Sequence, residues 1–168
     1  MENLNFINTY FIDEKIESLL FIILGILSIM MALIFLFIIQ YSFYKGFAYP
    51  LLLIGVIQLI VGTTVYIRSP KDIIRVGNMI KFETKKIKTE ELPRIEKVLY
   101  NFTIYKWFEI GLIILGIILF FYFKNSALTF WKGFGLGLLI QASVMLTLDV
   151  FAENRSRTYF EMLLNWTI

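Results

Sequence analysis

Four ionisable side chains lie within or at the ends of long apolar runs, and they are the residues best suited to do chemistry. Glu109 follows Trp107 near the start of one run, Asp149 lies near the end of another, and Arg68 ends a third. Glu153 is four residues after Asp149, so a helix places both on one face. Charges in hydrocarbon usually face a bundle interior and pair. We therefore expect an inner-face charge cluster in which Arg68 pairs with Glu109, Asp149 or both.

This charge cluster has two interpretations, a latch between helix ends or the cytoplasmic mouth of a path for cations or protons. The chain contains no His and no Cys, which removes the commonest zinc ligand, the thiolate nucleophile and the usual proton shuttle. We find no nucleophile–base pair, no metal-ligand spacing and no phosphate-binding loop. We therefore expect no enzyme activity, no metal and no cofactor.

Two amides and two glycines are the other notable residues of the apolar runs. Gln58 and Gln141 are the deepest amides, and a hydrogen bond between helices in lipid is worth about 0.6–2 kcal/mol. They could be structural glue between two helices or a polar binding point on a substrate path. Gly133 and Gly137 form a GxxxG pattern, which favours close helix packing.

The apolar runs themselves define the expected fold. A helix of about 20 apolar residues crosses a hydrocarbon layer of about 30 Å, and 58% of this chain is hydrophobic. We expect an all-α membrane protein whose four transmembrane helices form a bundle, with a cytoplasmic helical hairpin that extends helices 2 and 3. The expected spans are residues 18–39, 47–67, 107–123 and 134–152.

The basic residues predict the orientation. Of the 16 Lys and Arg residues, thirteen lie on the side that holds both termini and the 68–106 loop, and three lie on the other side. Basic residues concentrate in cytoplasmic loops. We expect a plasma (inner) membrane protein that crosses the lipid bilayer several times, with both termini cytoplasmic.

The loop 68–106 has the pattern of a helical hairpin. Ser69 and Pro70 are typical of a helix start, so we expect a kink or break there. A second helix should begin near Glu90 and run into the third span, with the two helices meeting near Lys88. We expect residues 1–168 to form a single membrane domain that includes an N-terminal interfacial segment, 1–17, and an amphipathic C-terminal tail, 153–168. Each of these segments is either an interfacial helix or a cover packed over the hairpin.

The tip of the hairpin is basic. Its densest part is Lys81, Lys85, Lys86 and Lys88. These lysines either contact anionic lipid or form a solvated tip that obeys the orientation rule. No nucleic-acid-binding motif is present.

The two halves of the chain share a faint pattern. Tyr44-Lys45-Gly46-Phe47 resembles Trp131-Lys132-Gly133-Phe134, and Ile22–Ile26 resembles Ile113–Ile117. The order is the same in both halves although the spacings differ. A true duplication would be a parallel repeat about an axis along the membrane normal, but apolar sequence of low complexity produces such matches easily, and we favour this second interpretation.

Two functions fit these features, and we favour the first. The chain could act by association, as a subunit or accessory of a membrane complex with another membrane protein, or as a homo-oligomer; protection against an envelope-directed toxin is a special case. The alternative is a small oligomeric transporter or channel with a polar path through Gln58 and Gln141 and an acidic inner mouth at Glu109 and Asp149. A membrane enzyme is the least favoured class.

Overall fold

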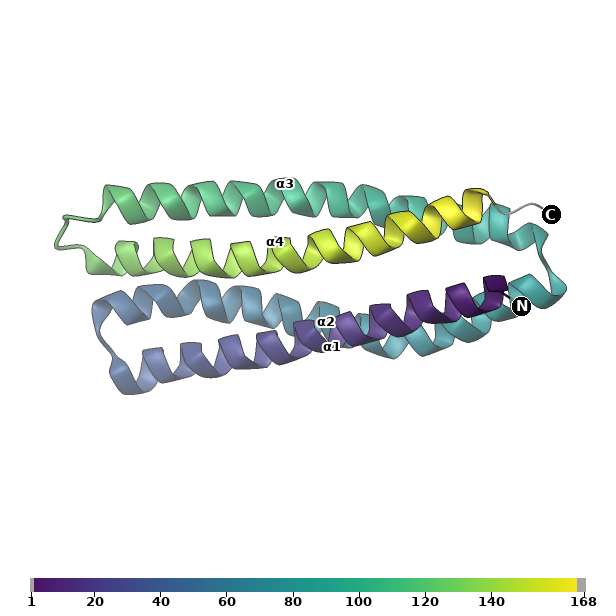
Figure 1. Cartoon of the computed structure of the whole chain (residues 1–168). Coiled ribbons are helices and arrows are strands. Elements are labelled where there is room, and N and C mark those ends of the chain that lie inside the picture. Colours follow the sequence, from purple (N-terminus) through teal and green to yellow (C-terminus); the bar gives the residue numbers. More distant parts are fainter. Residues whose placement is uncertain (1, 166–168) are drawn as a thin grey trace.

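The chain forms an all-α four-helix bundle (Figure 1), and a computed structural model describes residues 2–165, with side chains from residue 5. The helices are α1 (Glu2–Ile34), α2 (Ser42–Phe82), α3 (Leu92–Tyr122) and α4 (Thr129–Leu164), with π-helical turns η1 (Phe35–Ile39) and η2 (Ile87–Glu91). Met1 and residues 166–168, including Trp166 of the predicted tail, lie outside the described residues.

Each helix is long and apolar enough to cross a membrane by length and composition. Large apolar side chains cover the outward faces, for example Leu27 on α1 and Ile118 on α3. A polar solvent would disfavour such a surface, whereas hydrocarbon matches it. The four predicted runs are thus four helices, and each continues beyond the predicted span.

The buried faces of α1, α2 and α4 repeat at alternating intervals of four and three residues. On α1 it comprises Ile7, Phe11, Glu14, Ser18, Phe21 and Gly25. On α4 it comprises Leu138, Ala142, half-buried Met145, Asp149, Ala152, Ser156, Tyr159 and Leu163. A mean period of 3.5 residues is that of left-handed coiled coils. This heptad seam is continuous from one end of the bundle to the other.

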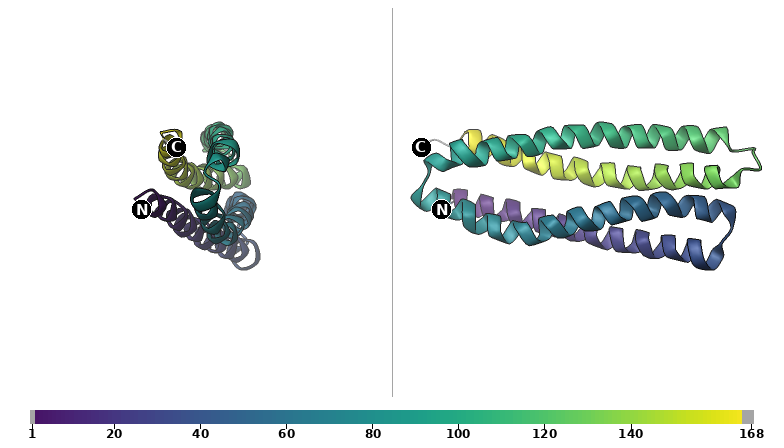
Figure 2. Two further views of the ribbon diagram at one scale, coloured as in Figure 1. Left: turned by 90° about the vertical axis from the view of Figure 1, so that its right-hand side faces the viewer. Right: turned by 180° about the vertical axis from the view of Figure 1, so that it is seen from behind.

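The helices pack as two hairpins, α1 with α2 and α3 with α4, and the hairpins join through α2 and α4. Figure 2 shows the two hairpins end-on and from behind. Among the described residues, the backbones of α2 and α3 do not approach each other closely, although their side chains share a buried cluster near the connecting turn. The bundle therefore has an opening along one side.

Glycines set the closest approach between the hairpins. A Cβ atom on Gly46 would lie 1.9 Å from the carbonyl oxygen of Phe130, and one on Gly133 would lie 1.9 Å from that of Phe43. A Cβ on Gly137 would lie 2.6 Å from the carbonyl oxygen of Phe47. Only glycine fits such distances. The Gly46 and Gly133 contacts are reciprocal, as two copies of one structural unit would make.

The hairpin end of the bundle, which holds both described chain ends and the Glu83–Lys86 turn, corrects two predictions. Helix α2 is continuous through Pro70, so the predicted helix start at Ser69 is wrong. The Ser69 hydroxyl lies 2.8 Å from the carbonyl oxygen of Val65, a bond within the same helix. The turn also comes earlier than Lys88, because α2 ends at Phe82 and η2 begins at Ile87.

The segments before residue 18 and after residue 152 are helical extensions of α1 and α4 that pack against the hairpin. Ile7, Tyr10 and Phe11 of α1 form one buried cluster with Tyr159 and Leu163 of α4. Val76, Met79, Ile87 and Ile95 of the hairpin complete this cluster. The sequence left open whether these segments are interfacial helices or a cover over the hairpin. Their described residues pack over the hairpin.

Candidate functional site

A cavity of about 680 Å³ lies in the opening between α2 and α3. Side chains of α2 and α3 form its walls, and α1 and α4 supply its other sides. The lining is mainly apolar and includes Ile54, Val61, Phe108 and Leu112. The cavity extends along the helices from the middle of the bundle towards the hairpin end. We call it the groove.

Two carboxyl groups that have no basic partner among residues 5–165 line the groove. Glu109 of α3 and Asp149 of α4 are 2% and 8% exposed, and their side chains are close enough to interact with each other. Neither carboxylate oxygen of Glu109 accepts a hydrogen bond from any of the described residues. We call these two residues the acidic pair.

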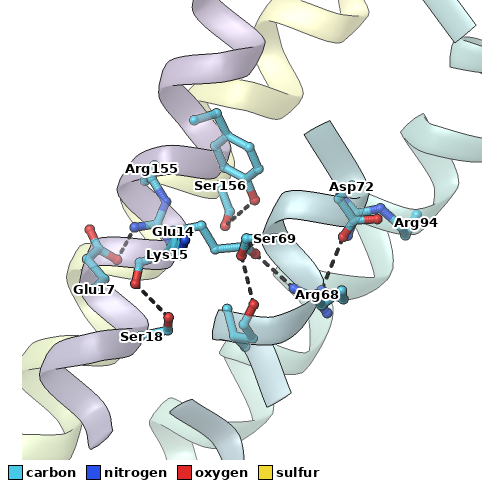
Figure 3. Close-up of polar contacts among 12 residues, drawn as sticks. Glu14, Lys15, Glu17, Ser18, Arg68, Ser69, Asp72, Arg94, Arg155 and Ser156 are labelled. Atoms are coloured by element: carbon cyan, nitrogen blue, oxygen red, sulfur yellow. Dashed lines mark hydrogen bonds and ion pairs between the residues drawn. The ribbon is translucent and has the colours of Figure 1, made fainter. Parts of the chain in front are cut away.

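Arg68 lines the groove, but the predicted pairing with Glu109 or Asp149 is wrong. Its guanidinium lies 2.8 Å from Glu14 Oε1 and 3.2 Å from Asp72 Oδ2 (Figure 3). The Ser69 hydroxyl lies 2.8 Å from the second oxygen of Glu14. The physical reason is that α1 is already helical at the hairpin end and brings Glu14 to α2, whereas the backbone of α3 stays away from that of α2.

The remaining charges near the groove are also paired. Arg155 of α4 forms an ion pair with Glu17 of α1 (Figure 3). Glu153, which we expected in the cluster with Arg68, instead pairs with Lys106 at 2.5 Å and with Arg157 at 3.0 Å. The structure therefore replaces the single predicted cluster by separate ion pairs and one acidic pair.

The two deep amides meet at the centre of the bundle. Gln141 Nε2 donates to Gln58 Oε1 at 2.8 Å and to the Ser28 hydroxyl at 3.0 Å. Gln58 is fully buried. These bonds join α1, α2 and α4, and neither amide lines the groove.

We predict that Gln141→Leu lowers the free energy of unfolding by about 1 kcal/mol, since an interhelical hydrogen bond in lipid is worth about 0.6–2 kcal/mol. Gln58→Leu should cost a similar amount, and the double variant less than the sum because the bond is shared. Unfolding in mixed micelles measures all three. Strictly additive effects would show that the two amides are not coupled.

A buried carboxylate that the sequence analysis missed ties the hairpin to α4. Glu91 is 0% exposed. It accepts hydrogen bonds from Arg75 at 2.8 Å, from Arg94 at 2.6 and 2.9 Å, and from Tyr159 at 3.0 Å. Tyr10 of α1 stacks on Tyr159 with ring centroids 4.0 Å apart. The sequence contains one signal for this site. Glu91 lies four residues before Ile95, so a helix places this carboxylate on the same face as an apolar residue.

The four tip lysines are exposed, and Lys86 pairs with Glu83. If Trp107 marks the edge of the hydrocarbon, the start of α3 at Leu92 lies about 22 Å beyond it, at 1.5 Å per residue. Electrostatic attraction is screened over about 8 Å at physiological salt. This distance favours the solvated tip over contact with lipid of the same membrane.

No group of three or more His, Cys, Asp or Glu that could hold a metal ion occurs among residues 2–165. The arrangement thus defines a class, a four-helix bundle of candidate membrane-spanning helices with an apolar groove and a buried acidic pair. No protein-family model, curated protein or solved structure matches the chain.

Proposed function

We propose that this protein is a small membrane transporter that exchanges a cation for protons at the acidic pair. The observation that carries the proposal is that Glu109 and Asp149 line a cavity and have no basic partner in the described part of the chain. A structural latch would instead pair these carboxylates with Arg68 or Arg155, which bind Glu14 and Glu17. A carboxylate that no protein cation neutralises can hold either a proton or a ligand cation.

The proposed orientation follows the basic residues, with the hairpin end in the cytoplasm of a cell whose plasma (inner) membrane holds the four helices. The groove then opens from the middle of the bilayer to the cytoplasmic boundary. It does not reach the opposite end of the bundle, which we call the loop end, where the close contacts of Gly46 and Gly133 bring α2 and α4 together. One four-helix chain therefore offers half a path, so the transporter is proposed to work as a homo-oligomer.

Proton exchange in liposomes tests this function. Purified protein is reconstituted with an acidic interior and a trapped pH dye, and sodium, choline or ethidium is added outside. At least one cation should raise the internal pH faster than in protein-free liposomes. Glu109→Gln and Asp149→Asn should reduce that rate at least tenfold, because each removes one of the two exchanging carboxylates.

Glu96→Gln is the matched control, since Glu96 is an exposed carboxylate on the same helix as Glu109. It should retain the wild-type rate. If none of the cations moves protons through the wild-type protein, the transporter proposal is wrong. The association function stays a prediction, and a strict monomer without a co-purifying protein in mild detergent would argue against it.

A further inference from the structure

We propose that the ligand of the groove is an amphipathic monovalent cation, with its apolar body between α2 and α3 and its positive centre at the acidic pair. The inference rests on the proposed function and names its substrate class. Three properties of the groove support it: its walls, its charge and its opening.

The walls suit an apolar body of moderate size. A cavity of about 680 Å³ lies in the range of about 300–1,000 Å³ that is typical of sites for small organic ligands. Ile54 and Val61 from α2 face it from one side, and Phe108 and Leu112 from α3 from the other. Burial of apolar ligand surface against such walls favours binding.

The charges of the groove select a cation. Four carboxylates and two guanidinium groups line it, so the lining is net negative when all are ionised. Both arginines already bind carboxylates of α1, which leaves the excess at Glu109 and Asp149. Two adjacent buried carboxylates disfavour each other's ionised form. A ligand cation between them would relieve that repulsion.

The same surroundings disfavour an inorganic ion. Hard cations need about six oxygen ligands or their own water, and the acidic pair is set in apolar walls. A cation with its charge on an organic body is poorly hydrated and needs no such shell. Phe108 and Tyr105 line the groove beside the acidic pair, and aromatic faces attract such cations within about 6 Å.

The opening between α2 and α3 gives this ligand a route. Phe108 and Tyr105 are both more than one-third exposed, as is Val61 across the groove. If the helices cross a bilayer, the opening faces hydrocarbon, where an amphipathic cation already concentrates. Entry from the lipid would require no passage through the closed loop end.

Calorimetric titration of the purified protein with tetraphenylphosphonium tests the proposal, with choline as the hydrophilic comparison. We expect saturable binding of tetraphenylphosphonium and at least tenfold weaker binding of choline. Glu109→Gln and Asp149→Asn should each weaken tetraphenylphosphonium at least tenfold, and the double variant should abolish binding. Glu96→Gln should bind as the wild type does.

A second variant fills the groove without touching its charge. Val61→Trp places a large side chain into open space on α2, and it should weaken binding at least tenfold while the bundle stays folded. Circular dichroism and gel filtration check the fold of every variant. Equal binding of tetraphenylphosphonium by the wild type, the double variant and Val61→Trp would show partition into apolar surface, and would overturn the proposal.

The two proposals fail in different ways. Tight binding of tetraphenylphosphonium that depends on Glu109 and Asp149, without cation–proton exchange, would support the ligand class and reject the transporter. Exchange driven by sodium or choline, without binding of tetraphenylphosphonium, would support the transporter and reject the ligand class.

Discussion

Replacing Gly46 or Gly133 with alanine should lower the free energy of unfolding by about 3 kcal/mol, a typical upper value for forcing extra atoms into a packed core. The added Cβ would lie 1.9 Å from a backbone carbonyl oxygen on the other hairpin, Phe130 or Phe43. A backbone atom cannot rotate away as a side chain can, so α2 and α4 must separate. Thermal unfolding of the purified protein in detergent measures the loss.

Two other glycines provide the control. A Cβ atom on Gly77 or Gly111 would meet no atom within 4 Å. Alanine at these positions should therefore be neutral or stabilise the helix by up to about 1 kcal/mol. If Gly46→Ala and Gly111→Ala unfolded at the same temperature, the close approach of the two hairpins at Gly46 would be wrong.

Replacing Glu91 with alanine should lower the free energy of unfolding by about 3–5 kcal/mol, the usual cost of removing one partner of a buried ion pair. Glu91 is fully buried, and its loss leaves the guanidinium group of Arg94 and the hydroxyl of Tyr159 without this acceptor. Arg75 loses one of its two carboxylate partners and keeps Asp72. Thermal unfolding gives the size of the effect. Proteolysis should also reveal early exposure of the hairpin end.

Smaller changes at the same site should follow the number of bonds removed. Tyr159→Phe removes one hydrogen bond and should cost about 1 kcal/mol. Glu96→Ala removes an exposed carboxylate on the same helix and should change stability by less than about 0.5 kcal/mol. If Glu91→Ala were as mild as Glu96→Ala, Glu91 would not join the hairpin to α4.

The number of helices could be predicted from the sequence because 20 consecutive apolar residues have few other solutions. The buried seam could not be found by hydropathy. In lipid the outward faces are as apolar as a protein core, while the seam includes Ser18, Gly25, Gln58 and Gly62. Only the alternating four–three spacing of buried residues indicates the seam. This spacing continues through positions such as residue 17, where hydropathy changes and a segment boundary is expected.

The same boundaries explain the wrong partner for Arg68. Hydropathy separates residues 1–17 from the first apolar run and gives no reason to place Glu14 beside α2. Glu14 nevertheless lies three residues after Phe11 and four before Ser18, on the seam that enters the first apolar run. The acidic pair, in contrast, consists of residues that the sequence itself singled out, since charges are rare inside apolar helices.

The unbroken seam has a mechanical consequence. Because the backbones of α2 and α3 come close only near the Glu83–Lys86 turn, where their side chains share a buried cluster, they resemble the arms of a pair of tweezers whose pivot protrudes from the apolar zone. Any widening between the arms strains that pivot. A molecule that binds the basic tip would then change how far α2 and α3 separate, without contacting the lipid.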